Sequence, residues 1–355
     1  MGTPDPRLGF LCASSEGDDG GIVTYRRDDD TGELTETARE PVPSASFLTL
    51  GPAGEYLYSV NRIGGGSVIA YEIVGSDGEL AEINRQSSEG AGPAYVSIDG
   101  RGEYVFVANY AGGTVAMYPV RDDGGLEAAC DVVEHEGSSV DPDRQEEPHP
   151  HSIDPGPDDR FVYAPDLGTD EVASYRIDRD VGAFEPIDPA VLHDGAGPRH
   201  LDFHPDRRGC YVINELDSTI TTYERDGETG VLTEIDTIST LPAGYDEESY
   251  CADVHVHPTG RWVYGSNRGH DSIAIFAVDE DDGSLSLIET ESTQGHWPRN
   301  FALDPAGRFL YAENRRSDSI VTFAIDQDDG TLTATGATYE ETAPICLAFL
   351  GGRIT

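Results

Sequence analysis

The sequence contains no lysine: all 23 basic residues are arginine, and they stand against 67 Asp and Glu, which gives a formal net charge of −44. Without lysine, Schiff-base catalysis is excluded. The negative charge also argues against nucleic-acid binding, because phosphates would be repelled. Self-repulsion on this scale is screened only at molar salt. We therefore expect a cytoplasmic protein of a halophilic organism, one that balances external salt with internal salt. An acidic tail for basic partners fits poorly, since the acids are spread through every loop.

Long apolar runs and a signal peptide are also missing. No stretch of about 18 apolar residues occurs, which predicts no membrane span. The first residues, MGTPDPRLGF, lack a basic region followed by an apolar one, which predicts no secretion signal. The cysteines are odd in number and widely spread, so we expect buried free thiols in a reducing compartment rather than disulfides. They are Cys12, Cys130, Cys210, Cys251 and Cys346. No GxSxG elbow supports a Ser-His-Asp triad.

What the sequence does contain is an internal repeat. A short apolar strand leads into a Pro- or Gly-containing turn and then into an aromatic-rich strand that ends in Asn or Asp, as in GPAGEYLYSVN and HPTGRWVYGSN. The copies end at Asn61, Asn109, Asp166, Asn214, Asn267 and Asn314. A third strand, an acidic Gly turn and an outer strand follow most copies. A spacing of roughly 50 residues with four strands per unit is typical of a β-propeller blade, and no segment has helical periodicity.

The number of blades follows from the strands at the chain ends. Six complete phrases are followed by a seventh inner strand, PICLAFL, which has no partners after it. The N-terminal segments LGFLCAS, GIVTYRR and GELTET match the second, third and fourth strands of a blade. The sequence therefore predicts an all-β fold, with residues 1–355 forming one seven-bladed β-propeller domain. Its last blade is closed by the N-terminal strands together with the C-terminal strand, which leaves no open edge.

Equivalent positions of the repeat carry unlike residues, which a purely structural repeat would not require. The residues after the terminal Asn or Asp are Arg62, Tyr110, Leu167, Glu215, Arg268 and Arg315. A second set at the start of the inner strand holds His149, His151, Arg199 and Arg299. We expect both sets near one mouth of the central channel. Glu215 or His151 would act as general base or acid there, and the guanidiniums would bind an anion and stabilise charge on a carbonyl oxygen.

Structural explanations compete with these roles. An Arg at a blade end can pair with the neighbouring blade, a His can be satisfied by backbone carbonyls, and Glu215 can pair with a structural Arg. The HPH and HVH strings have a spacing that could hold zinc, but His257 lies in a turn position of the repeat, which favours a structural role. The acidic Gly turns lack EF-hand spacing. We therefore expect no metal site.

Several strings resemble the propeller-type 6-phosphogluconolactonase family, which includes the fungal carboxymuconate lactonizing enzymes. They are PHPHSIDP, GPRHLDFHP, YVINELDSTITTY and SNRGHDSIAIF, and the resemblance covers essentially the whole chain. It implies a cofactor-free propeller acting on an anionic lactone, with catalytic residues falling on His151, Arg199, Glu215 and Arg268. Arg62 departs from the Glu that this family tends to carry there, and segment 131–148 is unusually long and acidic. Both departures bear on substrate identity.

Three functions remain open from the sequence. The first is hydrolysis of an anionic sugar lactone such as 6-phosphogluconolactone, with His149, Arg299, Arg315, Arg62 and Tyr110 in substrate binding. The second is a carboxymuconate-type lactonizing enzyme with a similar pocket. The third is a non-catalytic propeller that binds another protein, against which the ionisable residues at equivalent positions argue. The natural lactone, the reaction direction, the choice of base and the oligomeric state are not decided at this level.

Overall fold

Strands make up most of the computed structural model, which describes residues 4–14, 20–205 and 209–352. The only helical element in these ranges is a single 3₁₀ turn, η1 (Ile63–Gly65). Residues 1–3, at the predicted signal-free N-terminus, and residues 206–208, in the HPDRRG turn, lie outside the described residues. No helix in the described ranges is long and apolar enough to cross a bilayer.

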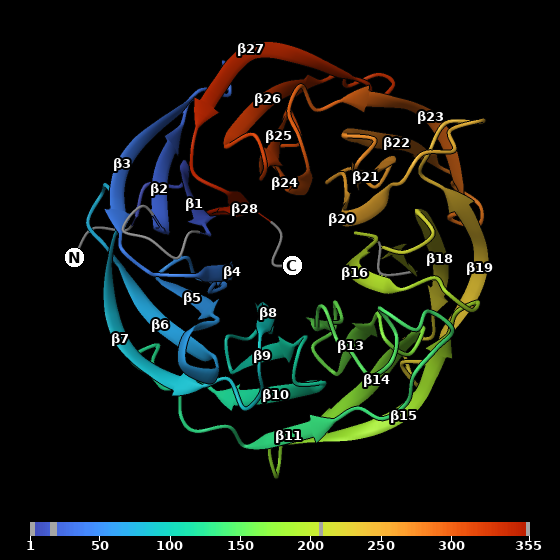
Figure 1. Ribbon diagram of the computed structural model, residues 1–355. Coiled ribbons are helices and arrows are strands. Elements are labelled where there is room, and N and C mark those ends of the chain that lie inside the picture. The colour runs from blue at the N-terminus through green and yellow to red at the C-terminus, as the bar shows by residue number, and fades with distance from the viewer. Residues whose placement is uncertain (1–3, 15–19, 206–208, 353–355) are drawn as a thin grey trace.

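The strands form seven four-stranded antiparallel sheets arranged in a ring (Figure 1). The innermost strands surround the axis of the ring, where a β-propeller has its central channel. From the inside outward, the first three sheets along the chain are β4 (Ala45–Leu50), β5 (Tyr56–Asn61), β6 (Ser67–Val74), β7 (Glu79–Ser87); β8 (Pro93–Ile98), β9 (Tyr104–Asn109), β10 (Thr114–Pro119), β11 (Asp131–Glu134); and β12 (Asp154–Pro155), β13 (Phe161–Asp166), β14 (Glu171–Asp178), β15 (Ala183–Val191). The next three are β16 (Pro198–Phe203), β17 (Gly209–Asn214), β18 (Thr219–Arg225), β19 (Leu232–Ser239); β20 (Tyr250–Val256), β21 (Trp262–Arg268), β22 (Ser272–Val278), β23 (Leu285–Ser292); and β24 (Pro298–Leu303), β25 (Phe309–Asn314), β26 (Ser319–Ile325), β27 (Leu332–Glu340).

The seventh sheet joins the two ends of the chain, as predicted. Its innermost strand is the C-terminal β28 (Pro344–Phe349), followed outward by β1 (Leu8–Ala13), β2 (Gly21–Arg27) and β3 (Leu34–Glu40). In Figure 1 the red β28 lies beside the blue β1, and in register Cys12 is opposite Cys346. Because both chain ends share one sheet, no blade is left with an open edge toward a missing neighbour.

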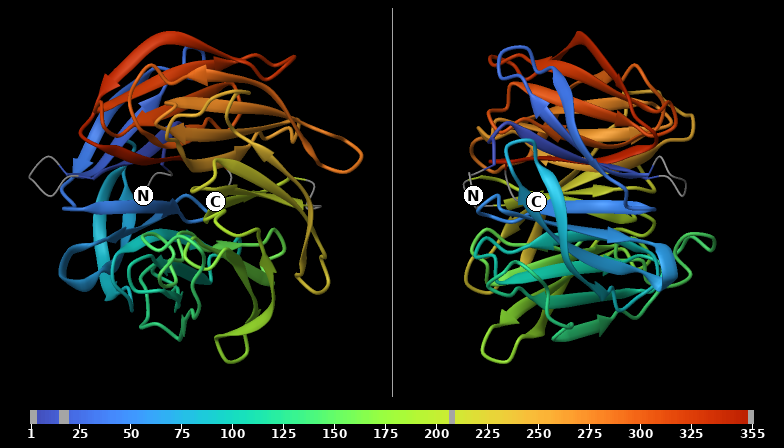
Figure 2. Two further views of the ribbon diagram at one scale, coloured as in Figure 1. Left: turned by 45° about the vertical axis from the view of Figure 1, so that its right-hand side comes forward. Right: turned by 90° about the vertical axis from the view of Figure 1, so that its left-hand side faces the viewer.

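Burial changes from the channel to the rim of the ring. The inner strands β4, β8 and β16 are buried at every position, whereas the outer β7 and β27 alternate between exposed and half-buried residues. The inner strands pack against neighbouring blades on both faces, while each outer strand turns one face to water. Seen from the side, loops protrude at two opposite faces of the ring (Figure 2). Residues on these loops and at the strand ends are the ones that can meet a ligand.

A recurrent tyrosine explains the aromatic character of the second strand. The hydroxyl of Tyr264 in β21 donates a hydrogen bond to the carbonyl of Gly330 in the next blade at 2.9 Å. The same bond joins four other blades to their neighbours, through Tyr58–Gly124, Tyr163–Gly230, Tyr211–Gly283 and Tyr311–Gly32. Each buried hydroxyl thus finds a partner across the blade interface, which fixes the angle between neighbouring sheets.

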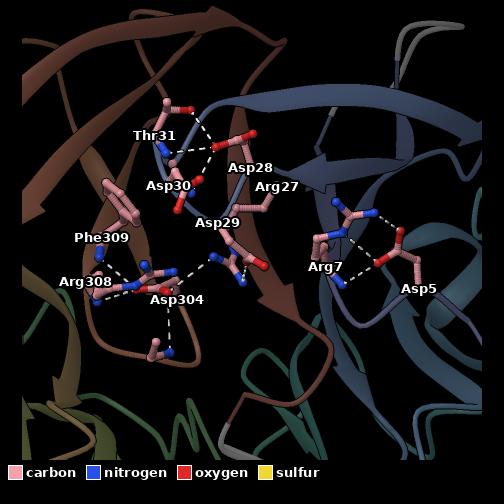
Figure 3. A network of polar contacts seen from close by, with 12 residues as sticks. Asp5, Arg7, Arg27, Asp28, Asp29, Asp30, Thr31, Asp304, Arg308 and Phe309 are labelled. Carbon is pink, nitrogen blue, oxygen red and sulfur yellow. Dashed lines mark hydrogen bonds and ion pairs between the residues drawn. The ribbon is translucent and has the colours of Figure 1, made fainter.

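Ion pairs reinforce the seam where the ring closes. Arg27 at the end of β2 lies 3.3 Å from Asp304, which follows β24, and 2.8 Å from Asp29 (Figure 3). The other oxygen of Asp304 accepts a hydrogen bond from the backbone N–H of Phe309 at 2.7 Å and so shapes the turn into β25. One carboxylate therefore connects the last complete blade to the blade built from both termini.

The expectation of buried free thiols holds for four cysteines and is wrong for the fifth. Cys12, Cys210, Cys251 and Cys346 are buried, but Cys130 is exposed. It lies in the irregular connection that precedes β11, outside the apolar strand pattern. All five are free thiols.

Candidate active site at one mouth of the channel

One rim of the channel is formed where each innermost strand begins and each second strand ends. In the sheet of β16, Pro198 lies opposite Asn214, and the backbone N–H of Glu215 donates to the carbonyl of Gly197 at 2.7 Å. The same pairing recurs in the sheet of β24 and β25. Both sets of positions singled out in the sequence are therefore carried to the same rim, although they are far apart along the chain.

Bulges at the start of the inner strands direct particular side chains toward the channel. In β16 the register shifts after Pro198 and leaves Arg199 without a partner on β17, and in β24 Arg299 is left in the same way. The corresponding residue ahead of β12 is His151, which follows the bridged Pro150. A bulge bends the strand locally and re-aims the extra side chain, a feature common beside active sites.

Glu215 is the centre of a cluster of ion pairs. Its Oε2 lies 3.0 Å from Nε of Arg199 and 2.7 Å from Nη2 of Arg268, and its Oε1 lies 2.6 Å from Nη2 of Arg144. Burial opposes ionisation of this carboxyl, but the charges of Arg268, Arg199 and Arg144 outweigh it and hold the pKa of Glu215 well below its usual range. Glu215 is therefore a carboxylate with both oxygens engaged.

His151 has the opposite character. Its side chain is buried, and no hydrogen bond from the described residues reaches its Nδ1. Its ring centroid lies 5.1 Å from that of His200 and 5.4 Å from that of Tyr110. Burial and then the positive charge of Arg199 lower the pKa of His151 well below 6.5, so the imidazole is neutral and carries a free lone pair or N–H.

His149 and Tyr110 form a wall beside this imidazole. Their rings are stacked with centroids 4.5 Å apart, and Nδ1 of His149 is 2.9 Å from the carbonyl oxygen of Tyr110. Because the nitrogen of His149 is engaged by backbone, its position is fixed, as the structural alternative from the sequence anticipated. The pair places an aromatic surface next to His151.

Three further arginines of the predicted site have no carboxylate partner among the described residues: Arg62, Arg299 and Arg315. Arg62 is exposed, and the other two are half-buried. Burial and then the charges of Arg199, Arg268, Arg62 and Arg315 lower the pKa of Arg299 well below its usual value. The mutual repulsion places these guanidiniums within electrostatic range of one another. Uncompensated positive charge of this kind is what an anion would relieve.

Arg144 belongs to the site although the sequence did not single it out. It comes from the long segment 131–148, which is held down by Gln145: its side-chain amide donates to the carbonyl of Leu167 at 2.9 Å and to Asp170 at 2.7 Å. The available signal was a lone arginine in an otherwise acidic segment. Only the folded chain shows that this arginine reaches Glu215.

Trp297 was missed as well. Its ring lies 5.6 Å from the guanidinium carbon of Arg268 and 3.4 Å from that of Arg316. Cation–π contacts of this kind hold arginine side chains over an aromatic face. Trp297 has φ 66°, an uncommon backbone conformation for a bulky residue and one associated with functional positions.

Two other features lie apart from this cluster. A surface cavity of about 840 Å³ between β17 and β21 shares no lining residue with the cluster of Arg144, Arg199, Glu215 and Arg268. His257 bonds the carbonyl of Gly307 at 2.8 Å and packs against Trp262, which fits the structural role expected for it. No three His, Cys, Asp or Glu side chains in the described ranges are grouped as a metal site would require.

Several known proteins with similar sequences and structures are named as lactonases. The family profile described as "Lactonase, 7-bladed beta-propeller" matches residues 9–349. The 6-phosphogluconolactonase of Bacillus subtilis is 34% identical over 345 residues, which cover 97% of this chain and 98% of that protein. A Formosa agariphila protein of the same name is 33% identical over 75% of this chain and 76% of its own length. The structure of the periplasmic gluconolactonase of Pseudomonas aeruginosa superposes with a TM-score of 0.90 at 32% identity, over 98% of this chain and 99% of that one.

Proposed function

This chain belongs to the seven-bladed β-propeller lactonase family, and we propose that it hydrolyses an anionic sugar lactone, 6-phosphogluconolactone, to the open acid. The supporting observation is the arginine cluster at one mouth of the channel. Within a protein of net charge −44, Arg62, Arg299 and Arg315 have no carboxylate partner among the described residues. A local excess of positive charge in an acidic protein is suited to a substrate that carries its own negative charge.

In the proposed reaction His151 is the base. Its neutral imidazole takes a proton from water as the water oxygen bonds to the lactone carbonyl carbon. The bond from that carbon to the ring oxygen then breaks, and the proton returns from His151 to the departing alkoxide. Water and lactone become one hydroxy acid, and no other reactant is consumed. Glu215 is a poor base because three guanidiniums stabilise its ionised form.

The arginines divide between two tasks. We assign Arg199 and Arg268 to the oxyanion that forms on the carbonyl oxygen; the ion pairs of both with Glu215 support this assignment. We assign the unpartnered Arg299, with Arg62 and Arg315, to bidentate binding of the phosphate group. The second candidate substrate is unphosphorylated gluconolactone, which the name of the Pseudomonas relative favours.

The test is a pH-stat assay of acid release at low and at molar salt, with 6-phosphogluconolactone, gluconolactone and carboxymuconolactone, each corrected for spontaneous hydrolysis. We expect the phosphorylated lactone to have the highest kcat/KM. His151→Asn should lower kcat by about 10²–10⁴-fold. Arg299→Met should raise KM for the phosphorylated lactone by about tenfold or more and leave gluconolactone nearly unaffected.

The matched control is Arg85→Met, which removes a surface arginine paired with Glu82 far from the channel mouth. It should leave both constants unchanged. Wild-type inactivity on the two sugar lactones, or turnover of carboxymuconolactone alone, would overturn the proposed substrate. Unchanged turnover in His151→Asn would overturn the assignment of the base.

A further inference from the structure

Beneath the arginines, one residue from each of six inner strands contributes to a second ring around the channel. Phe47, Tyr95, His200, Asp253, Asn300 and Cys346 line a small cavity there. His200 in β16 and Asp253 in β20 belong to neighbouring blades, and both are buried. Neither is on the channel rim, so neither is among the groups placed to touch the lactone.

His200 connects this second ring to the site above. Its Nε2 lies 3.0 Å from Nη1 of Arg199, and its Nδ1 lies 2.7 Å from Oδ1 of Asp253. A guanidinium has donors only, so Nε2 must be the acceptor and Nδ1 must carry the proton donated to Asp253. This requires one tautomer of the neutral imidazole. Burial and then the charge of Arg199 lower the pKa of His200 to about 3, in agreement with the neutral form.

Asp253 is itself held from two further sides. Its Oδ2 lies 3.0 Å from Nε2 of His255 and accepts a hydrogen bond from the side-chain amide of Asn300. The ring of His200 packs with its centroid 5.1 Å from that of Tyr95 and 5.9 Å from that of Phe47. Neither His200 nor Asp253 can reorient without breaking these contacts.

Three of the five N–H donors of Arg199 have partners in the protein. Nε donates to Glu215, and the two N–H groups of Nη1 are directed to His200 and to the carbonyl of Ala252. No hydrogen bond from the described residues reaches Nη2. The contacts therefore fix the guanidinium plane of this buried side chain, and Nη2 is the nitrogen still able to donate to a ligand.

We propose that the His200–Asp253 pair is a positioning device that orients Arg199 toward the lactone carbonyl. The inference rests on the proposed function, because it assigns Arg199 to the developing oxyanion. A donor aimed before the reaction needs no reorganisation as charge develops, so its orientation affects kcat more than KM. Supporting residues of this kind commonly change activity by about 10–100-fold when removed.

The central variant is His200→Phe, which retains an aromatic ring between Tyr95 and Phe47 but removes the acceptor for Arg199. It should lower kcat by about 10–100-fold with KM changed by less than about threefold. His200→Gln, whose amide can accept from Arg199 and donate to Asp253, should recover part of that loss. Asp253→Asn should also lower kcat, because the imidazole tautomer is no longer fixed.

A double-mutant cycle distinguishes positioning from a general loss of structure. In an Arg199→Lys background, His200→Phe should have little further effect on kcat, since the group it orients is already gone. His257→Phe is the matched control, because it removes another buried imidazole that packs on an aromatic ring, at 4.8 Å from Trp262. It should lower thermal stability and leave kcat unchanged.

A readout independent of activity separates this inference from the proposed function. Nitrogen-15 NMR of the imidazoles, assigned with His200→Gln, should show a neutral His200 protonated at Nδ1 in the wild type and a changed tautomer population in Asp253→Asn. A charged imidazole or the other tautomer in the wild type would overturn the inference even with full lactonase activity. So would an unchanged kcat in folded His200→Phe, or a full additive loss in the Arg199→Lys background. Inactivity of the wild type would overturn the proposed function, while the NMR result would still decide how Arg199 is held.

Discussion

At the scale of single residues, the protonation state of each ionisable group near the channel depends on its burial and on the charges beside it. Glu215 is ionised because guanidiniums surround it, and His151 is neutral because it is buried and because the nearby guanidiniums of Arg199, Arg299 and Arg268 repel a further positive charge. Asp154, deeper in the channel, accepts a hydrogen bond from the hydroxyl of Tyr95 at 2.8 Å, yet its other oxygen has no partner among the described residues. Burial raises the pKa of Asp154 to about 7.

The pH dependence of catalysis should depend on the charge of the substrate. As a base, His151 must be neutral, so the acidic limb of kcat/KM should lie below pH 6.5, its unperturbed pKa. A bound phosphate offsets the positive charges of Arg199 and Arg299, which raises the pKa of His151 in the complex. The acidic limb of kcat should therefore lie at higher pH than that of kcat/KM for 6-phosphogluconolactone, and less so for gluconolactone. If the acidic limbs of kcat and kcat/KM lie at the same pH for both substrates, this expectation is contradicted.

Asp154→Asn should stabilise the protein at neutral and higher pH. The carboxyl pKa is raised from 3.8 to about 7 in the folded state, so its contribution is fully favourable below pH 3.8 and is lost as the pH rises through about 7. Asn cannot ionise and escapes that loss. The gain in unfolding free energy should be on the order of 2 kcal/mol at pH 8 and shrink toward pH 5. Urea unfolding of the wild type and the variant at pH 5 and pH 8, at fixed salt, measures this gain. A gain that is the same at both pH values would refute the raised pKa of Asp154.

At the scale of elements, bulges and one inserted segment determine which side chains reach the mouth. The bulges at the start of β16 and β24 re-aim Arg199 and Arg299. Segment 131–148 brings Arg144 to Glu215 from outside the repeat. The repeat phrase showed where strands begin and end. It did not show that Arg144 of this segment contacts Glu215, because no local periodicity encodes that contact.

Arg144→Met should weaken binding of an anionic lactone without disabling the chemistry. It removes one of three positive charges on Glu215 and leaves Arg199 and Arg268 in place. Because Arg144 is half-exposed and solvent screens it, KM for 6-phosphogluconolactone should rise by about three- to tenfold, with kcat within about twofold. Steady-state kinetics would show the change in KM, with Arg121→Met as the control, because Arg121 is equally half-exposed and pairs with Asp123 on the surface. A large fall in kcat at constant KM would place Arg144 in the chemical step instead.

At the scale of the whole molecule, the ring combines a locally positive mouth with a strongly negative surface. The net charge of −44 produces a repulsion that surface ion pairs such as Arg85–Glu82 only partly offset. The cytoplasmic location expected from the sequence stays a prediction, as does the high-salt habitat.

Salt should therefore stabilise the fold. Raising KCl from about 0.1 to 1 M shortens the Debye length from about 10 to 3 Å, and the melting temperature should rise over that range and then level off. Scanning calorimetry in KCl, with sucrose as a neutral co-solute, tests the cause. A rise that continues linearly past 1 M, or one that sucrose reproduces, would indicate solute exclusion rather than screening.

The amino-acid sequence by itself determined the seven blades and their closure, because strand periodicity, Asp and Gly turns and the unpartnered strand at the C-terminus are local properties that add up along the chain. It also indicated which positions would face the channel, since equivalent positions of a repeat occupy equivalent places in a ring. Only the tertiary structure decided that Arg144 and Trp297 join the site, that Glu215 is held by three arginines, and that His200 supports Arg199 from below. Several of these contacts join separate blades or involve the inserted segment, and the pKa shifts depend on burial and neighbouring charge, which exist only once the ring has closed.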